Sequence, residues 1–320
     1  MKANQRTAAT NESPELATTS IGKAGWRALA TSFLGWMFDG YESYALILVM
    51  AVAVRQLLSP KRAPEASVYM GGLLTVTLLG WAVGGVTAGV LADYIGRKRM
   101  LMLSILWYAA FAGLTAVSQD YWSLLIFRFL TGFGLGAEWG PGTAIVAEFW
   151  PPSSRGRAGG VLHSAYGVGS LLASGIWLLL NRLGPSSWRY MFVIGILPAF
   201  LLLFVRRWVH EPALWVAANN RRREARKHLE MGVISQQDRE LIQFTMTRVL
   251  SESELRRRVG LLMLMSISTV VGWWSVSKWI PQYAAQLATN SGQSSEHWAS
   301  LAGSCLTSER SRGILCWDGW

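Results

Sequence analysis

Seven long apolar runs constrain this chain more than any other feature of its sequence. A bilayer core about 30 Å thick is crossed by roughly 20 apolar residues in helical form. The runs are continuously apolar and do not alternate with polar residues, so they predict membrane-spanning helices and not barrel strands. We therefore expect an all-α polytopic membrane protein, with spans at about 28–54, 68–92, 100–118, 121–148, 158–180, 189–205 and 259–286.

The composition and the placement of charge agree with a membrane protein. Hydrophobic residues make up 51% of the chain and charged residues only 15%, against about 25% charged residues in soluble proteins. The net charge of +11 is typical of some nucleic-acid-binding proteins, but here the basic residues gather in alternate loops. This asymmetry predicts a cytoplasmic N-terminus and a cytoplasmic loop at 206–258. We expect a multi-pass protein of the plasma membrane (the inner membrane of a bacterium) with the lipid bilayer, and no nucleic acid, as its partner.

Ionisable side chains inside the spans are the first candidates for function, because charge within a bilayer is costly. Asp39 and Glu42 lie about one helical turn apart and share a face of the first span. Two close carboxylates in a low-dielectric medium do not both stay ionised easily, which suits groups that take up and release protons. The alternative is an ion pair with a neighbouring span that only locks the structure. Tyr41 is expected to line the same cavity or to anchor an interface.

The fourth span carries two further charged candidates, Arg128 and Glu138. Arg128 is expected to hold an anionic substrate or a proton-carrying carboxylate, or else simply to balance the charge of Asp39 or Glu42. Glu138 precedes the Gly-Pro-Gly run at 140–142. That run is expected to kink the helix and to free backbone groups that line a cavity.

The remaining polar candidates each have an equally good structural explanation. His163 in the fifth span is expected either to titrate or to pack between helices. Trp273 and Lys278 in the seventh span are expected to face a substrate. The alternative for Lys278 is that its side chain only extends to the membrane surface, with no contact to a substrate. In the second span four glycines at GxxxG spacing favour close helix packing: Gly80, Gly84, Gly85 and Gly89. The end of the fourth span and the following loop are expected to form a structural cytoplasmic charge cluster of Glu148, Arg155 and Arg157.

The motifs of several other functions are missing from the sequence. No Gly-rich phosphate loop ends in Lys-Ser/Thr, which argues against direct ATP coupling. No HExxH or CxxC is found, so no metal or cofactor is expected. No nucleophile–base constellation is visible, and we expect a protein that is not an enzyme.

Two segments resemble the major facilitator superfamily. LADYIGRKR at 91–99 resembles its signature loop, and the resemblance implies that the carboxylate of this loop latches the inner gate against arginines while a glycine permits the turn. RFLTGFGLGAEWGPGTAIVAEFWPPSSRGRAGG at 128–160, with FDGYES in the first span, resembles the metabolite/sialate and organic-acid:proton symporter branch. The signature positions are Gly89, Asp93, Gly96, Arg97 and Arg99.

The resemblance implies a fold and a function. The fold would be two six-helix bundles around a cavity that opens alternately to each side, of which this chain holds the N-terminal bundle and the seventh span of an incomplete second one. The function would be proton-driven symport of a small organic anion (a carboxylate, sialate or aromatic acid), with Arg128 as a participant in proton transfer. The alternatives are a sugar/proton symporter of the same superfamily and a truncated membrane scaffold that does not transport.

The expected organisation has five parts. A cytosolic tail (1–26) precedes the six-helix bundle (27–206), and a charged cytoplasmic loop (207–258) precedes the start of the second bundle (259–300). The last part (301–320) reads LAGSCLTSERSRGILCWDGW where the superfamily has an eighth span. We interpret it as a truncated chain or a shifted reading frame, with a genuine polar tail as the alternative.

Overall fold

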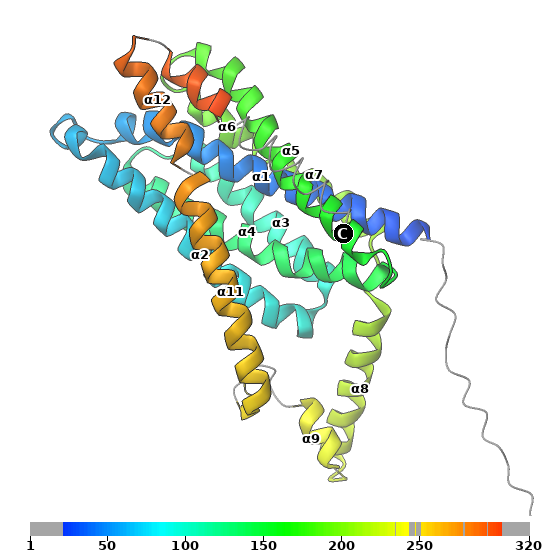
Figure 1. The fold of residues 1–320 in the computed structure, drawn as a ribbon. Coiled ribbons are helices and arrows are strands. Elements are labelled where there is room, and N and C mark those ends of the chain that lie inside the picture. The colour runs from blue at the N-terminus through cyan, green and yellow to red at the C-terminus, as the bar shows by residue number, and fades with distance from the viewer. Residues whose placement is uncertain are drawn as a thin grey trace, which may run out of the picture.

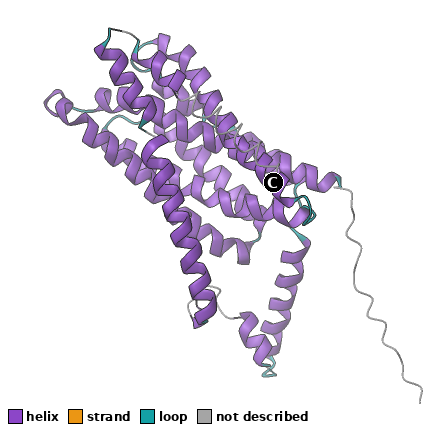
Figure 2. Cartoon of the chain, in the orientation of Figure 1, coloured by secondary structure: helices purple, strands orange, loops and turns teal. Residues whose placement is uncertain are grey.

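The structure is a computed structural model that describes residues 22–302, apart from 234, 243–246, 248–250, 278 and 293. Helices connected by short loops make up this described part, and it contains no strand (Figure 2). The expected all-α polytopic class is confirmed. Five of the described helical segments are long and apolar enough to cross a membrane: Lys23–Leu57, Pro60–Ile95, Arg97–Ala116, Arg155–Leu183 and Trp188–Trp208.

The first six predicted spans all fall on helices that pack into one bundle (Figure 1). The helix of the fourth predicted span is not among the five segments that are long and apolar enough to cross a membrane. It is the helix that carries Arg128, Glu138 and Glu148. The bundle consists of α1 (Lys23–Leu57), α2 (Ala66–Ile95), α3 (Arg97–Ala116), α4 (Tyr121–Phe149), α5 (Arg155–Leu180), α6 (Trp188–Ile194) and α7 (Pro198–Trp208), with a 3-10 turn η1 (Pro60–Glu65) before α2.

Small residues bring α1 against α5 and α2 against α4. A Cβ at Gly40 of α1 would overlap the backbone carbonyl of Tyr166 in α5. On α2, a Cβ at Gly80 or Gly84 would overlap backbone atoms of α4. Two of the four predicted packing glycines therefore make close helix contacts, while Gly85 and Gly89 have room for a Cβ. These contacts pack α5 against α1 and α2 against α4, the two helices that carry the buried charges.

The sixth predicted span is broken in the structure. Residues 195–197 form a turn between α6 and α7, and α7 begins at Pro198. Proline has no N–H and its ring clashes with the carbonyl four residues earlier, so a helix ends before it. Amides in the turn bond three residues back, as Ile196 N does to Val193 O at 3.1 Å. The break matters because it lies beside the buried charges described below.

Beyond the bundle, the charged loop is partly helical. It contains α8 (Ala213–Glu230) and α9 (Gln236–Ile242), which extend away from one end of the bundle (Figure 1). The seventh predicted span corresponds to α11 (Ser253–Ser277) and α12 (Ile280–Asn290). The apolar side chains of α11 are exposed, for example Leu262 at 62%. At α12, the Gln282 amide donates to the carbonyl of Ile47 in α1.

Candidate functional site

Four charged side chains are buried at the contact between α1 and α4. Asp39 and Glu42 come from α1, and Arg128 and Glu138 come from α4. Each is at most 1% exposed. All four were candidates from the sequence, and the fold brings them into one cluster.

Arg128 pairs with Glu42 and not with Asp39. Its Nη1 donates to Glu42 Oε1 at 2.5 Å. The Arg128 guanidinium carbon also lies 5.1 Å from the centroid of the Phe192 ring in α6, which is a cation–π distance. The second Glu42 oxygen lies against Gly195, where a Cβ would overlap it. The ion pair is thus enclosed by the break between α6 and α7.

The ion pair leaves hydrogen-bonding capacity unused. Arg128 Nε and Nη2 and the second Glu42 oxygen are buried and have no hydrogen-bond partner. Guanidinium N–H groups form a planar fork that matches a carboxylate. Because unpaired buried polar groups are costly, this fork offers a binding site for an anion or for a second carboxylate of the protein.

Two other predicted residues have structural partners. The Tyr41 hydroxyl donates to the carbonyl of Met191 at 2.9 Å and so ties α1 to α6. His163 Nδ1 lies 2.8 Å from the carbonyl of Gly159, and its ring meets the Trp36 ring edge-on at 4.8 Å. For His163 this favours the helix-packing alternative. Lys278 and the side chain of Trp273 lie outside the described residues.

Three aromatic residues of the site were missed in the sequence. Trp36 and Trp139 stack with ring centroids 4.2 Å apart, and Tyr108 from α3 is 0% exposed. The indole N–H groups and the Tyr108 hydroxyl have no hydrogen-bond partner. A signal was present, because Trp36 precedes Asp39 by three residues and Trp139 directly follows Glu138.

Helix α4 continues through the Gly-Pro-Gly run, which was expected to kink it. Pro141 lies inside the helix. The Thr143 hydroxyl donates to the carbonyls of Trp139 at 2.6 Å and Gly140 at 3.0 Å. The carbonyl that lacks its helical N–H donor because of Pro141 is that of Ala137, four residues earlier, so the Thr143 hydroxyl bonds the next turn of the helix and not the freed carbonyl.

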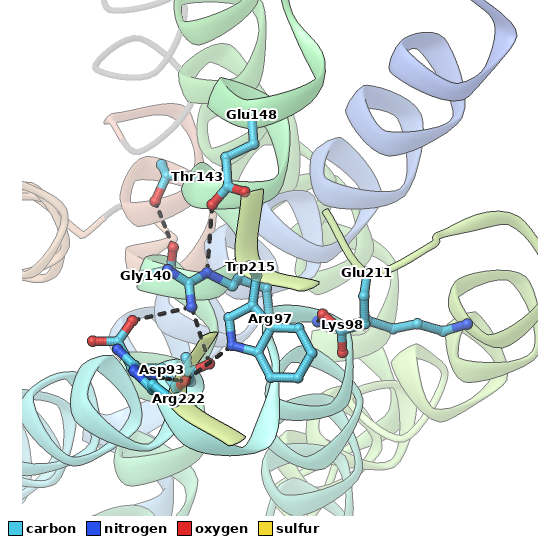
Figure 3. A network of polar contacts seen from close by, with 10 residues as sticks. Asp93, Arg97, Lys98, Gly140, Thr143, Glu148, Glu211, Trp215 and Arg222 are labelled. Atoms are coloured by element: carbon cyan, nitrogen blue, oxygen red, sulfur yellow. Dashed lines mark hydrogen bonds and ion pairs between the residues drawn. The ribbon is translucent and has the colours of Figure 1, made fainter. Parts of the chain in front are cut away.

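A second polar network lies at the end of the bundle from which α8 extends (Figure 3). Arg97 Nη1 pairs with Asp93 at 3.0 Å, and Arg97 Nε pairs with Glu148 at 3.4 Å. The Asp93 carbonyl accepts from Trp215 Nε1 at 3.0 Å and from Arg222 Nη1 at 2.7 Å. The signature loop therefore joins α2, α4 and α8.

The expected charge cluster at the end of α4 has a different partner. Glu148 pairs with Arg97 of the signature loop, and neither Arg155 nor Arg157 forms an ion pair in the described chain. Arg155 donates instead to the carbonyl of Trp150 at 3.4 Å. Glu148 has this partner because the C-terminal end of α4 packs beside the α2–α3 loop, which sequence proximity does not reveal.

Glu211 caps the N-terminus of α3. Its carboxylate accepts from the backbone N–H groups of Lys98 at 3.2 Å and Arg99 at 3.3 Å. Gly96 has φ +112°, and a Cβ there would overlap the Glu211 carboxylate. Glycine is therefore required both by the turn and by the cap. Arg99, one of the predicted signature residues, contributes its backbone N–H to this network.

We expect Glu211→Ala to loosen the first turn of α3, because two helix N–H groups lose a charged acceptor at the positive end of the dipole. Such caps contribute about 0.5–2 kcal/mol. Hydrogen exchange of the amides at 98 and 99 should accelerate. Glu230→Ala is the matched control, since Glu230 is exposed on α8. Equal exchange in both variants would show that the cap is not stabilising.

Comparison with known proteins identifies the family. The family described as Sugar (and other) transporter matches residues 28–292. The chain belongs to this family, within the major facilitator superfamily. Its members are transporters and not enzymes, and they are integral membrane proteins. The resemblance seen in the signature loop is thereby confirmed.

Several relatives of this family member are named as transporters of metabolites. A Haemophilus influenzae protein named as a metabolite transport protein is 32% identical over 84% of the chain and 61% of its own length. A Cupriavidus pinatubonensis protein named as a 4-methylmuconolactone transporter is 35% identical over 59% of the chain and 44% of its length. The Escherichia coli sialic acid transporter NanX is 28% identical over 59% and 45%.

The fold is that of solved transporters. A crystal structure of a D-xylose–proton symporter superposes with a TM-score of 0.63 at 19% identity, over 90% of this chain and 66% of that one. This likeness shows the major facilitator fold alone. The match to this chain spans 44–61% of the length of these three relatives.

Proposed function

We propose that this family member carries out proton-coupled symport of a small organic anion by alternating access. The observation that carries the proposal is the buried Glu42–Arg128 pair, whose guanidinium has two unpaired nitrogens. Relatives named for sialic acid and for 4-methylmuconolactone support an organic acid as substrate.

The proposed mechanism uses competition for Arg128. While Glu42 is ionised it holds Arg128 in the ion pair, and the pair is neutral. When Glu42 takes up a proton, its charge no longer holds the guanidinium, and a substrate carboxylate becomes the favoured partner. Proton and anion therefore bind together, and the rocking of two bundles exposes both to the other side. Asp39, Glu138 and Tyr41 belong to the same proposed pathway.

The test is uptake by the purified chain in proteoliposomes under an inward proton gradient. Radiolabelled benzoate and N-acetylneuraminate serve as anion probes, and xylose represents the sugar alternative. Uptake by protein-free vesicles is subtracted for each probe, because undissociated benzoic acid crosses a bilayer without a carrier. We expect the gradient to drive uptake of an anion probe and not of xylose, and a protonophore to abolish it. Uptake of xylose alone would favour the sugar/proton alternative. If the uptake of all three probes did not depend on the proton gradient, the proposal would be contradicted.

We further propose that the N-terminus and the α8–α9 segment are cytoplasmic. In intact bacteria expressing a chain whose native cysteines are replaced by serine, a membrane-impermeant maleimide should label Lys61→Cys in η1 and not Arg226→Cys in α8. Permeabilised cells should label both positions. Labelling of Arg226→Cys and not of Lys61→Cys in intact cells would contradict the proposed topology.

A further inference from the structure

Asp39 and Glu138 form a second set of buried charges beside the ion pair. Both side chains are 0% exposed, and none of their four carboxylate oxygens has a hydrogen-bond partner. The Glu138 carboxylate packs against Gly35, one helical turn before Asp39 on the same face of α1. The two carboxylates therefore face each other across the α1–α4 contact.

Among the described residues, the groups around this pair supply donors but no free cation. On α1 the nearest charge is Glu42, and on α4 the Arg128 guanidinium is engaged by Glu42. From α3, the unpaired Tyr108 hydroxyl lies within electrostatic range of Glu138 and then of Asp39. The Trp139 indole lies beside Asp39, and the His163 ring of α5 meets both rings of the Trp36–Trp139 stack edge-on.

We propose that Asp39 and Glu138 share one proton and act as a carboxyl dyad with a net charge of −1. Two ionised carboxylates facing each other in a low-dielectric site repel strongly, whereas one proton between them forms a hydrogen bond. The Tyr108 hydroxyl and the Trp139 N–H are buried donors suited to the single remaining charge. The shared proton supplies a donor to buried carboxylate oxygens that otherwise have no hydrogen-bond partner.

A proton fits this site better than a metal ion does. Hard cations such as Ca²⁺ take about 6–8 oxygen ligands, and Mg²⁺ needs an octahedral set. In the part of the chain that the structure describes, no group of three or more His, Cys, Asp or Glu is placed to hold a metal ion. Two carboxylates alone do not provide such a shell.

The dyad gives the proposed transport cycle a second proton site. It lies one helical turn from Glu42, so the two sites share a face of α1. Loss of the dyad proton places two like charges across the α1–α4 contact, and its return removes the repulsion. The role of the dyad in coupling rests on the proposed function, but its protonation is measurable in the absence of substrate and transport.

The test is infrared spectroscopy of the purified chain in lipid vesicles as a function of pH. At neutral pH a free Asp or Glu is ionised, so the carbonyl band of a protonated carboxyl reports the dyad. We expect this band in the wild type. In Asp39→Asn and in Glu138→Gln the band should disappear at a pH about one unit lower or more, because the second carboxylate no longer disfavours ionisation. The double variant should lack the band.

Two controls and four outcomes make the test decisive. Glu148→Gln and Glu65→Gln each remove a carboxylate outside the dyad and should leave the band in place. Absence of the band in the wild type, its persistence in the double variant, or its loss in either control would each overturn the dyad. A band seen only after sodium is replaced by N-methylglucamine would overturn it in favour of a monovalent cation. Because no substrate is present, failed uptake would refute the proposed function without affecting this result.

Discussion

Arg128→Gln is expected to abolish anion uptake by the reconstituted chain. Truncating one partner of a buried, hydrogen-bonded charge pair costs about 2–5 kcal/mol, which corresponds to a loss of about 30-fold or more. The substitution also leaves Glu42 as an uncompensated buried charge, and this lowers stability by about 3–5 kcal/mol. Uptake of benzoate and N-acetylneuraminate and the thermal unfolding midpoint measure the two effects.

Companion variants separate the loss of function from misfolding. Arg128→Lys keeps the charge but not the planar fork, and we expect it to fold and to transport poorly. The double variant Glu42→Gln/Arg128→Gln should regain stability, because no unpaired charge remains, but not uptake. Arg182→Gln is the matched control, since Arg182 is exposed outside the cluster. Normal uptake by a folded double variant would exclude the ion pair from the mechanism.

Glu42→Gln is expected to uncouple transport from the proton gradient. Glutamine still accepts a hydrogen bond from Arg128 but carries no exchangeable charge. At zero membrane potential, a gradient of one pH unit supports about tenfold accumulation of a substrate carried with one proton, or about 1.4 kcal/mol. We expect this accumulation to vanish in Glu42→Gln while exchange of labelled for unlabelled anion across the membrane continues.

The control for Glu42→Gln is Glu65→Gln, the same substitution at an exposed position at the end of η1. It should accumulate the anion as the wild type does. Full accumulation by Glu42→Gln would assign the coupling proton to another group. Loss of exchange together with accumulation would instead give Glu42 a role in substrate binding.

The elements that depend on local pattern were predictable from the sequence. Continuous apolar runs predicted the first six spans. The spacing of Gly80 and Gly84 predicted the close packing of α2 against another helix at these two glycines. The spacing of Asp39 and Glu42 predicted one shared helix face, and their burial agrees with it. Each of these features is set by residues within a few turns of one helix.

The features that depend on tertiary contacts were not predictable. Either carboxylate of α1 was an acceptable partner for Arg128, and only the packing of α4 on α1 gives it Glu42. The Glu211 cap acts on an α3 terminus more than a hundred residues earlier in the chain, and no local motif marks it. Pro198 is a helix breaker, but it lies in an apolar run long enough to cross a membrane, so the run predicted one unbroken span.

The central claim is that a proton moves with the anion. The most direct measurement records the external pH of a weakly buffered suspension of proteoliposomes when benzoate or N-acetylneuraminate is added, relative to protein-free vesicles, because undissociated benzoic acid crosses a bilayer without a carrier. Symport predicts that the medium becomes more alkaline as the transported anion enters, and that Glu42→Gln takes up the anion without this change. Anion entry into wild-type vesicles at constant external pH would contradict the account.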